Sequence, residues 1–291
     1  MDRQANRPAQ WFLVLCPAAV GCLLGGLILD GGSSISAFGI SVTTVALFIA
    51  IVAAVLPIAS LKKPFRAYRL LQGVARSALS RQALLFAVFF SLLAVDWALT
   101  LAKMPQLWLG IVTVVVGVAT VLAVAMTYML QSHLSWRHWS TPVTFTATVL
   151  TLGVATALVI SLHWIGVLID GATGALVVRV LVLVGVAATA AATDGRMFYL
   201  KTASPDTFEA LAITRGENRA NWLLSLILGI GVAVVATSVS FVPGATWVVA
   251  IAWAALLVGS LLERRLFFVS AVPRSLRSEV RRFPTASVVK E

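Results

Sequence analysis

The sequence predicts an all-α, polytopic membrane protein, built as a bundle of eight transmembrane helices. Of its 291 residues, 60% are hydrophobic and 11% are charged, whereas about 25% of the residues of a soluble domain are charged. The apolar residues gather into runs of about 20, the length that a helix needs to cross a bilayer. These observations exclude a soluble enzyme, a disordered chain and a disulfide scaffold. The spacing of Cys16 and Cys22 also matches no zinc or redox motif.

Eight apolar runs account for the helices in order. Short turns with Gly or Pro separate them on one side of the membrane, and longer polar connections separate them on the other. Helices are favoured because lipid cannot satisfy an open sheet edge. The first run lacks an Ala-x-Ala cleavage site and is interpreted as a retained helix. Residues 1–291 are expected to form a single membrane domain, with spans at 11–29, 40–60, 82–102, 106–130, 143–169, 175–193, 222–242 and 246–262.

The basic residues predict the orientation of the bundle. Apart from Lys103 and Arg179, every Lys and Arg lies in the N-terminal segment, in one of the longer connections or towards the C-terminus. Basic residues stay on the cytoplasmic side of a membrane. Both termini are therefore expected on the cytoplasmic side of an inner membrane. That arrangement requires an even number of spans, as eight is.

Three ionisable residues inside the spans are candidates for function. Asp96, His163 and Arg179 each fall towards the outer end of a predicted span. Intramembrane ionisable residues often mark proton paths, so the three together are a candidate proton path. The alternative is a structural ion pair between Asp96 and Arg179, with the arginine reaching for the interface.

A membrane haem is not expected, and neither is a metal in this chain. Haem between two spans needs two facing ligands such as two histidines. His133 and His138 share one inner connection, and His163 is about 30 Å of helix away at the opposite boundary. The expected surroundings are the lipid bilayer and protein partners, with no nucleic acid.

The connection between the second and third spans predicts an amphipathic interfacial helix over residues 61–81. Pro64 suits the first helical position. From there Phe65, Tyr68, Leu71, Val74, Ala75 and Ala78 recur at three- and four-residue spacing, with Arg66, Arg69 and Arg76 on the other face. The helix anchors the chain to anionic lipid, at about 1 kcal/mol per basic residue, or docks an acidic partner, or covers a pocket that residues 136–142 complete.

Three stretches carry a family resemblance. They are SLKKPFRAYRLLQGVARSALSRQ (60–82), YMLQSHLSWRHWSTPVTF (128–145) and GSLLERRLFF (259–268). In this order they resemble signature regions of the membrane-anchor subunit of dimethyl sulfoxide reductase. The most diagnostic residues are Pro64, Arg66, Ala67 and Tyr68, followed by Ser77, Leu79 and Ser80.

The resemblance implies a place in a three-subunit complex of anaerobic electron transport. Such anchors hold a four-cluster iron–sulfur subunit and a molybdopterin catalytic subunit on the membrane, exchange electrons with quinone or menaquinol, and carry no haem. The implied quinone-binding residues are Ser60, Lys62, Arg66, Tyr68 and Gln82. The implied partner-docking residues are Lys63, Arg69, Arg76, Arg81, Trp136, Arg137, His138 and Arg264.

Departures from the family pattern leave the quinone chemistry open. The family usually has His where this chain has Ser60, Glu where it has Gln82, and Glu where it has Ser260. Ser and Gln hydrogen-bond a quinone oxygen but are not bases near neutral pH. The site either binds quinone while water or Lys62 handles protons, or the chain is a purely structural anchor. A stand-alone transporter is a further alternative, which would need a polar path through the midplane.

Overall fold

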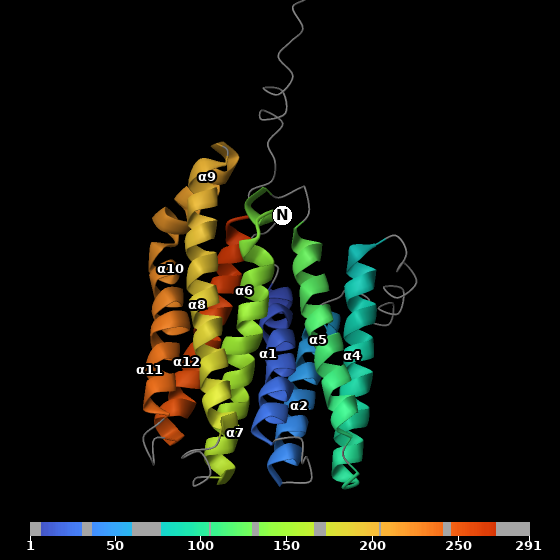
Figure 1. The fold of residues 1–291 in the computed structure, drawn as a ribbon. Helices are drawn as coiled ribbons and strands as arrows, with labels where there is room; N and C mark the ends of the chain where they lie inside the picture. The colour runs from blue at the N-terminus through green and yellow to red at the C-terminus, as the bar shows by residue number, and fades with distance from the viewer. Residues whose placement is uncertain are drawn as a thin grey trace, which may run out of the picture.

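The chain is helical throughout the part that the computed structural model describes, residues 7–30, 37–59, 77–104, 106–129, 134–165, 173–203, 205–240 and 246–271. Eight helices within these ranges are long and apolar enough to cross a membrane, and they stand side by side (Figure 1). This confirms the prediction of an all-α, multi-pass membrane protein.

Part of the predicted site lies outside the described residues. Residues 60–76 contain most of the predicted interfacial helix. With them go the predicted site residues Ser60, Lys62, Lys63, Arg66, Tyr68, Arg69 and Arg76.

The first four spans are single helices. They are α1 (Arg7–Leu29), α2 (Ala37–Ala59), α4 (Ala78–Leu101) and α5 (Leu107–Tyr128). The short turn η2 (Leu134–Trp136) precedes the fifth span.

Two of the last four spans contain a π-helical turn. The fifth span runs through α6 (Ser140–Thr148), the π turn η3 (Val149–Gly153) and α7 (Val154–Ile165). The sixth is α8 (Thr173–Thr202), followed by α9 (Pro205–Ala212) and the π turn η4 (Ile213–Glu217). The seventh runs through α10 (Arg219–Leu226), the π turn η5 (Ile227–Gly231) and α11 (Val232–Val239), and the eighth is α12 (Thr246–Val269).

Several helices extend further than their apolar runs, α4, α8 and α12 among them. The runs predicted a start at residue 82 for the third span, but α4 begins at Ala78. They predicted ends at residues 193 and 262 for the sixth and eighth spans, but α8 and α12 continue to Thr202 and Val269. Hydropathy marks the length that lipid surrounds, whereas the backbone hydrogen bonds continue into the polar residues beyond it.

Helix α1 lies at the centre of the bundle. Leu13, Val20 and Leu23 belong to a core that includes residues of α2, α4 and α5. Val14 and Ala18 belong to a second core, shared with α7, α8, α11 and α12. Figure 1 shows α4 and α5 on one side of α1 and α8, α10 and α12 on the other. A helix that is hydrophobic all round is suited to this buried position.

The closest crossing in the centre joins α1 to the fifth span at two glycines. A Cβ atom added to Gly21 would lie 2.0 Å from the carbonyl oxygen of Val149, and one added to Gly153 would lie 2.5 Å from Cα of Gly21. Small residues allow helix backbones to approach in lipid, where packing drives association. Gly153 is the last residue of the π turn η3, so the irregular turn lies at the crossing itself.

We expect Gly21→Ala to destabilise the bundle, because α1 and the fifth span must separate to admit the new methyl group. The free energy of unfolding should fall by about 2 kcal/mol, the typical cost of overpacking. Unfolding of the purified protein in detergent measures the change.

Gly231→Ala is the matched control, because a Cβ atom there meets nothing within 4 Å. Equal stability of the two variants would contradict the importance of the crossing.

Candidate functional site

Near the start of α4, the amide side chain of Gln82 points into the bundle. Ser77 is extended, with φ −120° and ψ 125°, and the helix begins at the next residue. Gln82 then heads a buried stripe that continues through Phe89, Leu93, Asp96 and Thr100. These positions recur at the spacing of one helix face. The side chain of Gln82 is therefore directed into the protein, as the predicted quinone-binding role requires.

The oxygen of this amide has no hydrogen-bond partner in the part of the chain that the structure describes. Gln82 is 8% exposed, and its Oε1 atom is buried with no hydrogen bond among the described residues. Such a buried acceptor costs about 1–3 kcal/mol, and native proteins rarely leave one unsatisfied. The atom is suited to accept a hydrogen bond from a ligand.

An aromatic cluster follows one turn further along α4. Phe86 lies 5.3 Å from Phe12 of α1, ring centre to centre, in an edge-on arrangement. Phe89 and Phe90 lie 6.2 and 6.5 Å from Phe86. Residues four apart share a helix face, so Gln82 and the cluster combine a polar acceptor with an apolar wall. This combination places a hydrogen-bond acceptor beside an aromatic surface.

Trp136 is held inside the subunit by the end of α12. Its ring stacks on Phe267 at 4.9 Å and an interplanar angle of 6°, and its Nε1 atom donates to the carbonyl oxygen of Phe267 at 2.8 Å. Tyr128 of α5 meets the Trp136 ring edge-on at 5.6 Å. These contacts join the connection between α5 and α6 to α5 and to α12.

Arg264 is fully buried near the end of α12. It is 1% exposed, and its Nη2 atom donates to Oγ1 of Thr148 at 2.8 Å and to the carbonyl oxygen of Thr144 at 3.3 Å. Its guanidinium carbon lies 4.0 Å from the centre of the Phe145 ring, a cation–π arrangement. The Nε atom is buried without an acceptor among the described residues.

His138 lies just before α6 and is half-buried. Its Nδ1 atom lies 2.9 Å from Oγ of Ser140 and accepts from the backbone N–H of the same residue at 3.3 Å. The ring stacks on Tyr199 at 4.6 Å. Burial, and then the charge of Arg196, lower the pKa of His138 below its ordinary value of 6.5. The imidazole is therefore neutral at physiological pH.

The structure places Asp96 and Arg179 in different surroundings. Arg179 is buried on α8 and donates to Ser240 at the end of α11, to the carbonyl oxygen at 2.8 Å and to Oγ at 3.2 Å. Asp96 is buried on α4 and lines a cavity of about 20 Å³ with Thr43 of α2 and other residues. The side chain of His163 lies outside the described residues. The described contacts trace no path through the three.

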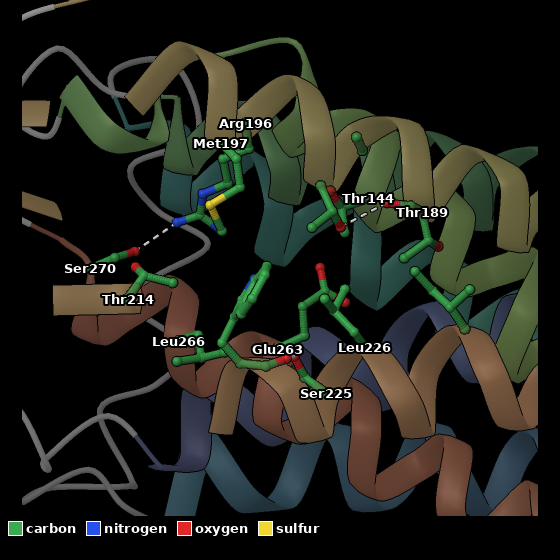
Figure 2. Close-up of a pocket in the computed structure, with 14 residues that line it drawn as sticks. Thr144, Thr189, Arg196, Met197, Thr214, Ser225, Leu226, Glu263, Leu266 and Ser270 are labelled. Carbon is green, nitrogen blue, oxygen red and sulfur yellow. Dashed lines mark hydrogen bonds between the residues drawn. The ribbon is translucent and has the colours of Figure 1, made fainter. Parts of the chain in front are cut away.

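A pocket that the sequence did not predict lies between α6, α8, α10 and α12, with a mostly apolar lining that also carries several polar groups. Its volume is about 40 Å³, and Thr144, Arg196, Thr214, Trp222, Glu263 and Ser270 are among its lining residues (Figure 2). From the sequence, the basic residues of this pocket indicate only the topology of the membrane spans. No local signal brings residues of four separate spans together, so the pattern alone could not reveal this Trp222 pocket.

A comparison with protein families identifies the group. The model of the DMSO reductase anchor subunit (DmsC) matches residues 6–269. The chain belongs to this family. A search of curated proteins finds no match. The match begins beside α1 and ends at the last residue of α12, so it spans the whole bundle and confirms the resemblance carried by the three motifs.

The described parts of the three motif stretches of this anchor subunit lie at one end of the bundle. The start of α4, the connection before α6 and the end of α12 all lie at the end where α1 begins, here called the N-terminal end (Figure 1). As an anchor, the subunit associates with catalytic reductase subunits at a membrane. The described parts of the motif stretches therefore share one end of the bundle.

The residues predicted to dock partners differ in exposure. Arg81 and Arg137 are exposed at the N-terminal end, and His138 is half-buried. Trp136 and Arg264 were expected on the docking surface, but both side chains are buried within the anchor subunit itself. Trp136 joins α12 to the connection between α5 and α6, and Arg264 joins α12 to the fifth span.

The neutral His138 predicts a pH dependence of stability. The pKa is lower in the folded protein than in the unfolded chain, where it is about 6.5. Stability is therefore fully present above that pH and is lost as pH falls through the folded pKa. A protonated ring also cannot accept from Ser140. The thermal unfolding temperature of the wild type should fall more between about pH 7.5 and about pH 5.5 than that of His138→Asn.

The comparison between variant and wild type removes the contribution of other titrating groups. Parallel pH curves for the two proteins would show that His138 does not titrate in this way.

Proposed function

We propose that this chain anchors an iron–sulfur subunit and a molybdopterin catalytic subunit at its N-terminal end, and exchanges electrons between quinone and that complex. Membership of the anchor family supports the assembly. The buried, unpartnered Oε1 atom of Gln82 supports the quinone site, because the hydroxyl of a quinol donates where this atom can only accept.

The proposed site holds the quinol rather than taking its protons. The Gln82 amide orients the ring through one hydrogen bond, and Phe86 with its neighbours supplies the apolar wall. A quinol that gives two electrons to the nearest cluster also releases two protons. An amide is no base near neutral pH, so water or Lys62 takes the protons in this proposal.

The charge distribution supports docking on the cytoplasmic side of an inner membrane. The long basic connections and the exposed Arg81 and Arg137 belong to the N-terminal end. Positive residues stay in the cytoplasm, and the same charges attract an acidic partner surface. Both termini lie in the cytoplasm in this proposal.

The competing function is a purely structural anchor. Ser60 and Gln82 stand where the family usually has His and Glu, which favours loss of quinone chemistry. The two functions differ in whether a quinol reacts with the assembled complex, so the same variants distinguish them.

Gln82→Leu is expected to lower kcat/KM for quinol by about tenfold, the value of one hydrogen bond to a desolvated group. Quinol-dependent reduction by the purified complex measures the effect. Gln82→Glu places a base at this position and should restore or raise turnover. Arg66→Ala is expected to impair turnover as well, on the implied role of that residue.

Gln106→Leu is the matched control, because Gln106 lies at the opposite end of the bundle and is exposed. Iron and molybdenum contents report assembly. Wild-type turnover in both Gln82→Leu and Arg66→Ala would contradict the site, whereas no turnover in any form would favour the structural anchor.

Purification of the tagged chain from its native membrane in mild detergent tests the partners. Molybdenum and iron should co-elute with the chain, without a haem absorption band. A chain that elutes alone and free of metal would contradict the proposed complex and make transport the next activity to assay.

A further inference from the structure

The Trp222 pocket opens between helices at the N-terminal end of the bundle. Figure 2 shows Arg196 and Met197 of α8 opposite Glu263 and Leu266 of α12. Trp222 lies near the start of α10. Two π turns flank the pocket, since Thr214 belongs to η4 and Ile230 to η5. Such turns occur frequently at functional sites.

The size of the pocket limits what it can hold. One water needs about 10–15 Å³ of such space, so the volume of about 40 Å³ admits about three water-sized groups. That is enough for a compact polar group and too little for the fused rings of a menaquinone. The pocket therefore suits a different kind of ligand from the quinone proposed at Gln82.

An unused donor lines the pocket. The Nε1 atom of Trp222 is buried with no acceptor among the described residues, and an indole N–H can only donate. Beside it, Arg196 donates from Nη2 to Oγ of Ser270 at 2.7 Å and has further N–H groups. These donors require an acceptor-rich ligand.

The charges around the pocket favour an anion. Arg196 lines the pocket, Arg264 follows the lining residue Glu263, and the guanidinium carbon of Arg215 lies 5.1 Å from the centre of the Trp222 ring. Among the described side chains that line the pocket, Arg196 and Glu263 carry opposite charges, and the excess of positive charge comes from Arg215 and Arg264, which lie outside the lining. An ion excluded from bulk water interacts more strongly with such charges than it would in solvent.

The hydroxyl groups of the lining add acceptors. Thr193 and Thr214 donate to backbone carbonyls of their own helical segments at 2.8 Å, and Ser225 does the same at 2.8 Å. Their lone pairs remain for a ligand. A group that accepts at one end and donates at the other matches this lining, as the phosphate and hydroxyls of a glycerol headgroup do.

We propose that the Trp222 pocket binds the phosphate of an anionic phospholipid headgroup at the N-terminal membrane boundary. Trp222 Nε1 and the guanidinium of Arg196 donate to phosphate oxygens, and Arg215 balances the charge at the rim. The serines and threonines accept from headgroup hydroxyls. Basic pockets between spans bind lipid headgroups at this depth. The proposal depends on the membrane location alone and not on quinone chemistry.

Native mass spectrometry of the purified complex, titrated with phosphatidylglycerol, tests the site. Trp222→Phe keeps the ring and removes the donor, so the apparent Kd should rise about tenfold. Trp247→Phe is the control, because Trp247 is 77% exposed, and it should bind as the wild type does. Glu263→Gln removes a negative charge beside the phosphate and should bind more tightly. Equal Tm values show that the variants are folded.

Two further ligands separate the possible sources of the phosphate. Diacylglycerol lacks the phosphate and should not bind in a Trp222-dependent manner. If inorganic phosphate binds alone, with the same dependence on Trp222, the phosphate site is supported and its occupant is free phosphate. Unchanged phosphatidylglycerol binding by Trp222→Phe would overturn the proposal. Weaker binding by Glu263→Gln would also overturn it, because that result is expected of a cationic ligand.

Discussion

The bundle depends on the contact between α1 and the fifth span at Gly21 and Gly153. In lipid the hydrophobic effect does not draw helices together, so close packing must do it. A backbone approach at this crossing lets α1 touch the fifth span while its other residues contribute to two separate cores. The other spans then assemble on the two sides of α1. The positions of the helices at the N-terminal end therefore depend on this crossing.

Unsatisfied polar atoms gather at that end. Within the described ranges, the buried side-chain atoms without partners are Oε1 of Gln82, Oγ of Ser135, Nε1 of Trp222 and Nε of Arg264. They come from the start of α4, the connection before α6, the start of α10 and the end of α12. Inside the spans, by contrast, threonine hydroxyls donate to their own helices, as Thr113 and Thr120 do at 2.7 and 2.8 Å. The described polar atoms that lack partners thus lie at the end where we propose that ligands and partner subunits bind.

The sequence predicted the number of spans and the family because both depend on local patterns. Apolar runs identify what crosses lipid, and the motif around Gln82 lies in one continuous stretch. The burial of Trp136 and Arg264 was not predictable from the sequence. An arginine or tryptophan near the end of a span is usually exposed, and only its contact with a second span shows that it is buried. The Trp222 pocket required the relative positions of four spans. The ends of α4, α8 and α12 were missed because hydrogen bonding, unlike hydropathy, continues past the lipid.

The π turn in the seventh span gives its two halves independent orientations. Each residue of an α-helix turns the chain by about 100°, and a π turn accommodates one extra residue within a helix. The turn η5 lets α10 direct Trp222 and Ser225 into the pocket while α11 directs Ala233 and Ala236 into the core. Removing a single residue from η5 would leave the span long enough to cross the membrane. It would nevertheless rotate the lining of the pocket towards lipid, so a one-residue length change here alters binding without altering topology.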